Sequence, residues 1–280
     1  MASEFELTRN ITIGQYVPTD SYIHRLDPRI KLFLFIILVL AIAFNTSYIG
    51  NLIGLILSFY LFWASRIPIS YGLSGVKPAI PFIVILAILQ LLFQGEVFSH
   101  GRVFVHYGFI LITSESIRLV IVSTVRFIEI IFLSSVLTLS TSITELTHSI
   151  QSLLSPLHKI KFPVHEISLI TTIAIRFVPT FAMEMEKMMK AQASRGADFG
   201  SGSWWRIIQR TKDMFPIIIP LFNTALSRAE DLILAMESRC YTPGGERTSF
   251  LVYKAVMKDY IILVIGIIIA LFLFLYSFPY

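Results

Sequence analysis

Long uncharged runs alternate with short charged segments along this chain. No charged residue occurs between Lys31 and Arg66, a run too long for one membrane helix because about 20 residues cross a bilayer. The polar cluster Asn45-Thr46-Ser47 divides it into two helices, at about 30–45 and 48–65. Further apolar runs, at about 78–95, 119–143 and 260–280, give five predicted spans in all. The pattern predicts an all-α polytopic membrane protein with about five transmembrane helices.

Composition supports this class. Hydrophobic residues make up 55% of the 280 positions and charged residues only 15%, and the mean hydropathy of +0.74 exceeds that of soluble domains. The net charge of +5 is modest, and in a membrane protein the location of basic residues matters more than their sum. We therefore expect a lipid bilayer and no nucleic acid as partner. Cys240 is the single cysteine, and we expect no cofactor and no bound metal.

The distribution of basic residues predicts the orientation. Basic residues precede the first span and follow the second, and 14 Lys and Arg lie within 141–258. Positive residues favour the cytoplasmic side, so we expect a cytoplasmic N-terminal segment (1–29) and an extracellular C-terminus. Between them we expect transmembrane helices 1–4 (30–140), a cytoplasmic or interfacial domain (141–256) and a last transmembrane helix (257–280). The extracellular loop near 94–115 is rich in Val, Phe and Tyr, which favours a β-hairpin or an extended loop.

The domain at 141–256 has helical periodicity. We predict two long amphipathic helices at about 165–195 and 213–240, and a shorter one near 144–156. Pro216 and Pro220 are expected to kink the start of the second long helix. Neither long helix is predicted to span the membrane, because Arg176 interrupts the first and the uncharged run in the second is short.

Both long helices end in similar tripeptides, Ser194-Arg195-Gly196 and Ser238-Arg239-Cys240, with the arginines 44 positions apart. One explanation is local: a cation at a helix C-terminus complements the helix dipole and contributes about 0.3–1 kcal/mol. The other is recognition, since an arginine fork binds a carboxylate at two points. A matched pair on one side of the membrane favours docking to a partner with two equivalent acidic grooves.

The two motifs, read as Ala193-Ser194-Arg195-Gly196 and Glu237-Ser238-Arg239-Cys240, resemble the paired Ala-Arg-Gly-type motifs of the T component of energy-coupling factor (ECF) transporters. The segment Leu26-Asp27-Pro28-Arg29 before the first span and the lone C-terminal span extend the resemblance over most of the chain. This resemblance implies a non-enzymatic scaffold in an ATP-driven importer of vitamins and trace nutrients. It also implies that two coupling helices dock into two ABC-type ATPase subunits, and that the membrane helices hold a substrate-binding S component.

Cys240 departs from that pattern, which has glycine at this position. A Cβ atom disfavours the left-handed turn that glycine allows. We therefore expect the second helix to run on to Tyr241 or Thr242 before Pro243 stops it.

Arg126 and Glu129 lie in the fourth predicted span, three residues apart on one helix face. Charges at membrane depth are costly unless they are paired. Two alternatives remain open: a local ion pair that makes the span tolerable, or a contact with a partner subunit or with the coupling helices.

Other functions fit less well. The chain has no Gly-x-x-x-x-Gly-Lys-Ser/Thr loop for ATP. The alternative of a self-contained permease predicts polar groups in several spans, and four of the five predicted spans carry no charge beyond Lys31 at the start of the first. An integral-membrane enzyme would need clustered acids or histidines at membrane depth, where only Arg126 and Glu129 qualify.

Overall fold

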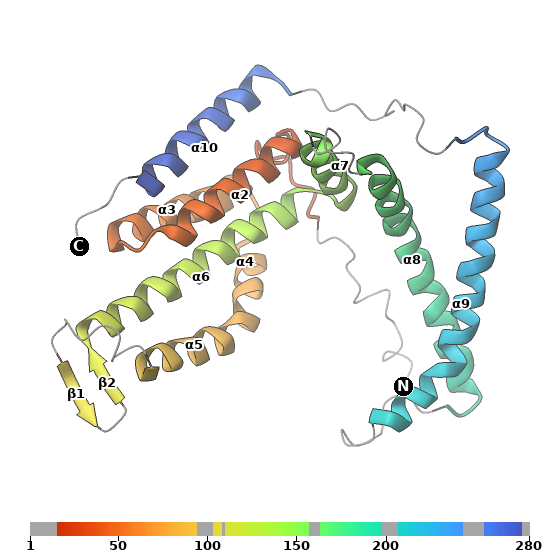
Figure 1. The fold of residues 1–280 in the computed structure, drawn as a ribbon, viewed down its shortest axis with the longest axis horizontal. Coiled ribbons are helices and arrows are strands. Elements are labelled where there is room, and N and C mark those ends of the chain that lie inside the picture. Colours follow the sequence, from red (N-terminus) through yellow and green to blue (C-terminus); the bar gives the residue numbers. More distant parts are fainter. Residues whose placement is uncertain are drawn as a thin grey trace. The chain divides into compact units, whose positions relative to one another are not determined.

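The computed structural model describes residues 16–93, 103–107, 110–156, 163–197, 207–242 and 255–275 (Figure 1). It divides into two compact units. One, which we call the bundle unit, consists of Gly14–Leu153 and Leu251–Tyr280. The other, which we call the paired-helix unit, is dominated by Leu154–Phe250. Each is described by itself.

The bundle unit is helical, which confirms the predicted fold class. Its two short strands form an antiparallel hairpin, one of the two alternatives expected for the segment near 94–115. A 3-10 turn spans Lys77–Ala79. The elements are α2 (Pro28–Phe44), α3 (Tyr48–Ala64), α4 (Ile69–Val76), α5 (Ile80–Phe93), β1 (Val103–Tyr107), β2 (Ile110–Thr113), α6 (Ser114–Ser140), α7 (Ile143–Leu154) and α10 (Met257–Leu275).

Two hydrogen bonds between helix ends show how the helices of this bundle are oriented relative to one another. Lys31 Nζ, at the start of α2, donates to the carbonyl of Ser140 at the end of α6 over 2.9 Å. Asn45 Nδ2, just after α2, donates to the carbonyl of Leu273 near the end of α10 over 3.1 Å. Helix α2 therefore runs antiparallel to α6 and parallel to α10, its neighbours in Figure 1.

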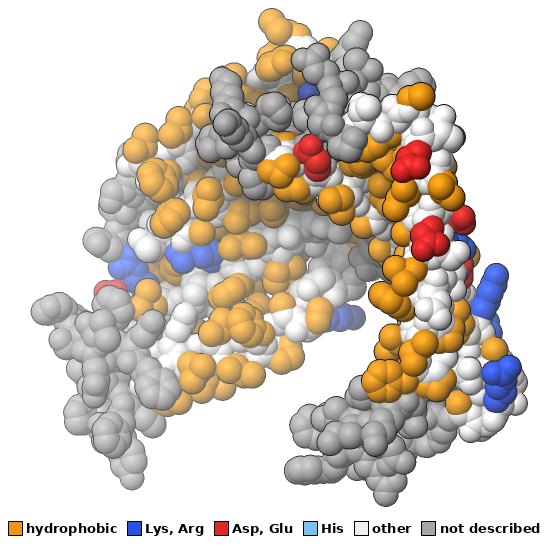
Figure 2. Space-filling model, turned by 45° about the vertical axis from the view of Figure 1, so that its right-hand side comes forward, with side chains coloured by type: hydrophobic (Ala, Val, Ile, Leu, Met, Phe, Trp, Pro, Cys, Tyr) orange, Lys and Arg blue, Asp and Glu red, His pale blue; other side chains and the backbone are white. Residues whose placement is uncertain are grey.

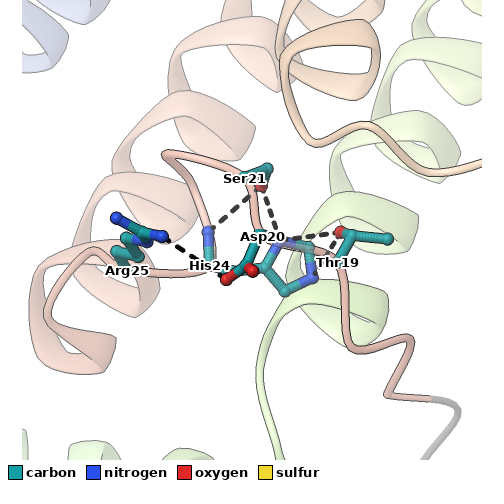
Figure 3. Close-up of polar contacts among 5 residues, drawn as sticks. All are labelled: Thr19, Asp20, Ser21, His24 and Arg25. Carbon is teal, nitrogen blue, oxygen red and sulfur yellow. Dashed lines mark hydrogen bonds and ion pairs between the residues drawn. The ribbon is translucent and has the colours of Figure 1, made fainter.

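A polar turn precedes α2 and positions its first residues (Figure 3). His24 lies with Nδ1 2.6 Å from Ser21 Oγ and Nε2 3.0 Å from the Val17 carbonyl. Desolvation by burial, assisted by the positive charge of Lys31, lowers the pKa of His24 below its usual value. Asp27 then caps α2 by accepting a hydrogen bond from the Arg29 amide over 2.9 Å.

The structure changes the account of the membrane spans. Within the described residues, four stretches are long and apolar enough to cross a membrane: Ile69–Leu92, Ser114–Ser140, Glu166–Ser194 and Met257–Leu275. Tyr48–Ala64 is a shorter apolar helix. The third span begins before the predicted residue 78, because the helical stretch continues through Pro78.

The paired-helix unit contains α8 (Val164–Ser194) and α9 (Ile207–Glu237), which pack against each other. Contrary to the argument from Arg176, the stretch Glu166–Ser194 of α8 has the length and composition of a membrane span, because Arg176 is the only charged residue between Glu166 and Glu184. The predicted start of α9 is also late. Pro216 and Pro220 lie inside that helix, after two or more turns.

Large hydrophobic side chains are exposed on many helices, among them Phe44 at 67% and Trp63 at 70%. Figure 2 shows hydrophobic side chains over much of the face in view. Apolar exposure on this scale is typical of a protein whose solvent is lipid or a partner subunit.

Glu129 of α6 is fully buried, at 0% exposure, and packs against Gly54 of α3. A Cβ atom at Gly54 would lie 2.7 Å from Glu129 Oε2 and 3.2 Å from its carboxyl carbon. The glycine is therefore what allows α3 and α6 to approach with the carboxylate between them.

We expect Gly54→Ala to destabilise the protein by about 1–3 kcal/mol, because the added methyl group overpacks this contact. Thermal unfolding in detergent measures the change. Gly75→Ala is the control, since its Cβ would lie 3.2 Å from the Ser135 hydroxyl and 3.7 Å from Ile131 Cγ2, both looser contacts than that at Gly54. In the double variant with Glu129→Ala, the cost of Gly54→Ala should largely vanish. Equal melting temperatures for Gly54→Ala and Gly75→Ala would contradict the argument.

Candidate functional site

The end of α8 forms a complete Schellman turn. Arg195 is the C-cap residue, and Gly196 follows with a φ of +87°. The Ala197 amide donates to the Gln192 carbonyl and the Gly196 amide to the Ala193 carbonyl, both over 3.0 Å. These are the two bonds that define this helix ending. The turn leaves Arg195 exposed at the tip.

The end of α9 repeats the same turn. The Tyr241 amide donates to the Met236 carbonyl over 3.0 Å, and the Cys240 amide donates to the Glu237 carbonyl over 2.9 Å. Cys240 has a φ of +56° and takes the place of Gly196. The expectation that this helix continues to Tyr241 or Thr242 is therefore wrong. The two hydrogen bonds of the turn offset the cost of a Cβ in left-handed backbone, which is about 1–2 kcal/mol.

The serines of the two motifs also match. Ser194 Oγ donates to the Ala191 carbonyl over 2.8 Å, and Ser238 Oγ donates to the Ala235 carbonyl over 3.0 Å. Each hydroxyl is thus bonded back to its own last turn. The structure therefore gives the two tripeptides one conformation, and the arginine is the long side chain that both present.

Arg195 and Arg239 are both exposed, and neither forms an ion pair with another described residue. Ala193 and Glu237, which precede the serines, complete the two motifs on the last turns of α8 and α9. An exposed guanidinium fork at the end of a helix is suited to binding a carboxylate from outside the chain. The dipole effect on each arginine's own helix is compatible with the same geometry.

An ion pair joins the two helices where they contact each other. Arg228 of α9 binds Glu184 of α8, and the two side chains are 37% and 17% exposed. These residues are also 44 positions apart, the spacing of the two motif arginines. The pair was not predicted from the sequence, although this repeated spacing is a signal that points to it.

The tips are placed symmetrically about that pair. Arg195 follows Glu184 by 11 residues, and Arg239 follows Arg228 by 11 residues. At 1.5 Å per residue, each tip lies about 16 Å along its helix from the pair. The two helices run in opposite directions in Figure 1, so the tips lie at opposite ends of the pair of helices.

Arg126 and Glu129 of α6 do not bond to each other. Arg126 donates through its guanidinium to the Asn45 carbonyl just after α2. Both Glu129 carboxylate oxygens are buried without a hydrogen-bond partner among the described residues. Arg126 thus joins α6 to the end of α2, a contact that the sequence did not indicate. Among the described residues there is also no group of three His, Cys, Asp or Glu that could hold a metal ion.

Comparisons with known proteins give one consistent result. The family model of the cobalt transport protein CbiQ matches residues 19–250. The energy-coupling factor transporter transmembrane protein EcfT of Streptococcus equi subsp. equi is 38% identical over 270 residues, which is 96% of this chain and 97% of the relative. EcfT of Brevibacillus brevis is 40% identical over 268 residues, covering 95% and 97%. EcfT of Lactococcus lactis subsp. cremoris is 38% identical over 269 residues, covering 96% and 98%.

Exchanging the residues at the left-handed positions tests the geometry of the tips. We expect Cys240→Gly to stabilise the second turn by about 1 kcal/mol and Gly196→Ala to destabilise the first by a similar amount. Hydrogen exchange should slow at the Cys240→Gly turn and accelerate at the Gly196→Ala turn. The unmutated tip in each variant is the control. Unchanged exchange at both mutated turns would contradict the Schellman geometry.

Charge reversal tests whether the ion pair sets the arrangement of the tips. We expect Glu184→Arg or Arg228→Glu alone to broaden the distances between spin labels on Cys240 and on an introduced Ala197→Cys. The double exchange should restore them, because the opposite charges face each other again. Reversing the charge of Glu230, an exposed residue of α9, is the control and should leave the distances unchanged. Identical distributions in all variants would exclude a role for the pair.

Proposed function

This chain belongs to the family of energy-coupling factor transporter transmembrane proteins (EcfT), and we propose that it couples two ABC-type ATPases to a substrate-binding S component. It is a membrane component of a transporter. In our proposal it has no catalytic activity of its own, and ATP hydrolysis takes place in the partner chains. The movement that hydrolysis produces reaches the S component through α8 and α9, and vitamins or other micronutrients are taken up.

The observation that carries this proposal is the repeated Schellman turn at the ends of α8 and α9. Two conformationally equivalent turns, each presenting an exposed arginine, fit two equivalent sites on two copies of one kind of ATPase. The tips are Ala193, Ser194, Arg195 and Gly196 on one side and Glu237, Ser238, Arg239 and Cys240 on the other. Each arginine would bind an acidic groove in two-point fashion.

Electrostatics supports the proposed orientation. Arg29 and Lys31 lie at the start of α2, Arg66 follows α3, and Lys258 lies in the first turn of α10. The hydrogen bond from Lys31 to Ser140 ties the start of α2 to the end of α6. The turn after α2, at Asn45-Thr46-Ser47, carries no charge. The positive-inside rule then assigns residues 1–29 to the cytoplasm and the end of α10 to the outside.

The proposed domain assignment follows from this orientation. The helices within 30–140, together with that of 257–280, form the membrane part, and 141–256 forms the coupling domain whose tips face the cytoplasm. Helix α8 has the composition of a span over much of its length. We therefore propose that it lies in contact with the membrane while its arginine-bearing end reaches the ATPase.

A self-contained permease is the rival function, and the buried polar residues of the bundle unit are the observation that favours it. Asn45, Asn51 and Glu129 are 7%, 3% and 0% exposed. Hydrogen bonds of Asn45, Asn51 and Arg126 go to backbone carbonyls at helix ends. Donors of Asn45, Asn51 and Arg126 are therefore engaged by the backbone, and only Glu129 of this group has no hydrogen-bond partner among the described residues. The coupling proposal remains the stronger one.

Replacing both tip arginines tests the proposal. We expect Arg195→Glu with Arg239→Glu to abolish vitamin uptake in vesicles that contain the complete transporter. The introduced carboxylates would be repelled by the acidic grooves of the ATPases. Arg→Lys at both tips keeps the charges but loses the forks, and should reduce uptake about tenfold or more if each fork contributes about 1 kcal/mol. If the arginines only complement their own helix dipoles, the lysine variant should keep nearly normal uptake. Normal ATPase binding and normal uptake in the glutamate variant would refute coupling through the tips.

A further inference from the structure

The bundle unit contains an apolar cavity of about 220 Å³ between α2, α3, α6 and α10. Its walls are mostly Leu, Ile, Val and Phe side chains, with Leu34, Leu38 and Leu61 among them. On α10 the lining residue Ile265 is 51% exposed even though it faces the cavity. The space is therefore open to the surroundings of the bundle rather than sealed within it.

One end of the cavity is polar. Ser140 lines the cavity and is 1% exposed, and its Oγ has no hydrogen-bond partner among the described residues. Lys31, another lining residue, uses Nζ to donate to the Ser140 carbonyl over 2.9 Å and the His24 carbonyl over 3.4 Å. An ammonium group has three donors, so one remains after these two bonds. A hydroxyl and an N–H are thus available to oxygen atoms of a ligand.

The cavity has the length and direction of part of a lipid chain. It extends along α2 from Lys31 to Leu38 and along α6 from Ser140 back to Leu133, which is about 10 Å at 1.5 Å per residue. The polar end coincides with the end of the bundle that carries Arg29 and Arg66. A hydrocarbon core is about 30 Å thick, so the apolar part reaches roughly a third of the way across.

The choice of occupant follows from the lining and the surroundings. Water is unfavourable in a cavity with apolar walls, and an empty one forfeits packing contacts. A partner helix, about 10 Å across with its side chains, is too wide to lie along a cavity of this volume. The hydrocarbon available in a bilayer is the acyl chain.

We propose that this cavity binds one acyl chain of a membrane glycerophospholipid, whose ester or phosphate oxygens are held by Ser140 Oγ and Lys31 Nζ. The lipid fills the space between α2, α6 and α10 and links these helices at the basic end of the bundle. This site does not depend on the coupling function proposed above.

A pair of tryptophan variants on α10 tests the site. Ile265→Trp places bulk in the cavity, whereas Leu271→Trp adds the same side chain at a residue that is 50% exposed and outside the lining. The protein is assembled in nanodiscs of phosphatidylglycerol and phosphatidylcholine, extracted, and analysed by native mass spectrometry. We expect retained phospholipid to fall about tenfold in Ile265→Trp, because the indole occupies the space of the chain, and to remain unchanged in Leu271→Trp.

Photolabelling locates the lipid and does not require a destabilising substitution. A phosphatidylglycerol with a diazirine in one acyl chain should label peptides of α2, α6 and α10 that line the cavity. A free fatty acid with the same group is the second probe, and stronger labelling by it would overturn the assignment to a phospholipid.

Ser140→Ala should weaken phospholipid retention without lowering the melting temperature of the lipid-free protein, since it removes an unpaired buried hydroxyl. Equal retention in both tryptophan variants, or labelling confined to other surfaces, would overturn the site.

Discussion

The contact between Glu184 and Arg228 is the constraint on which the arrangement of the two arginine tips depends. Apolar contacts are non-directional, so by themselves they specify the register of two 31-residue helices less sharply than a charged pair does. An ion pair at the crossing selects one register, because a shift by a turn separates the charges. Once that register is set, each arginine lies 11 residues from the ion pair. The two tips are therefore equally far from it along their helices.

The bundle unit meets a different constraint, since a bilayer provides no water to bond with the free carbonyls at helix ends. The structure meets it with long-range side-chain donors. Lys31 binds the carbonyl of Ser140, Asn45 that of Leu273, and Arg126 that of Asn45. Each bond also joins two helices, so the groups that satisfy the backbone also fix the packing. This accounts for Lys31, Asn45 and Arg126 among helices that are otherwise apolar.

Much of the fold could be predicted from the sequence, because hydrophobic run length and helical periodicity are local signals. They indicated helices near those observed as α2, α3, α7 and α8, and the arginine tripeptides indicated the helix ends. What could not be predicted depends on contacts between distant residues. The partner of Arg126 proved to be the Asn45 carbonyl and not Glu129, since spacing along one helix shows which residues share a face but not what approaches that face. The ion pair between Glu184 and Arg228 was missed for the same reason.

Cys240 shows that a residue other than glycine can occupy the left-handed position of such a turn. Glycine preference at left-handed positions led to the expectation of a longer α9, yet the chain turns at Cys240 with the hydrogen bonds that Gly196 makes possible in α8. The penalty for a Cβ is of the same size as the net value of one or two backbone hydrogen bonds, about 1 kcal/mol each. The two terms nearly balance, and Pro243 two residues after Tyr241 adds a further reason to stop, because a proline disfavours helical backbone in the residue before it. Identical tip geometry therefore does not require identical sequences, and it is the backbone turn, with the arginine it presents, that the two tips share.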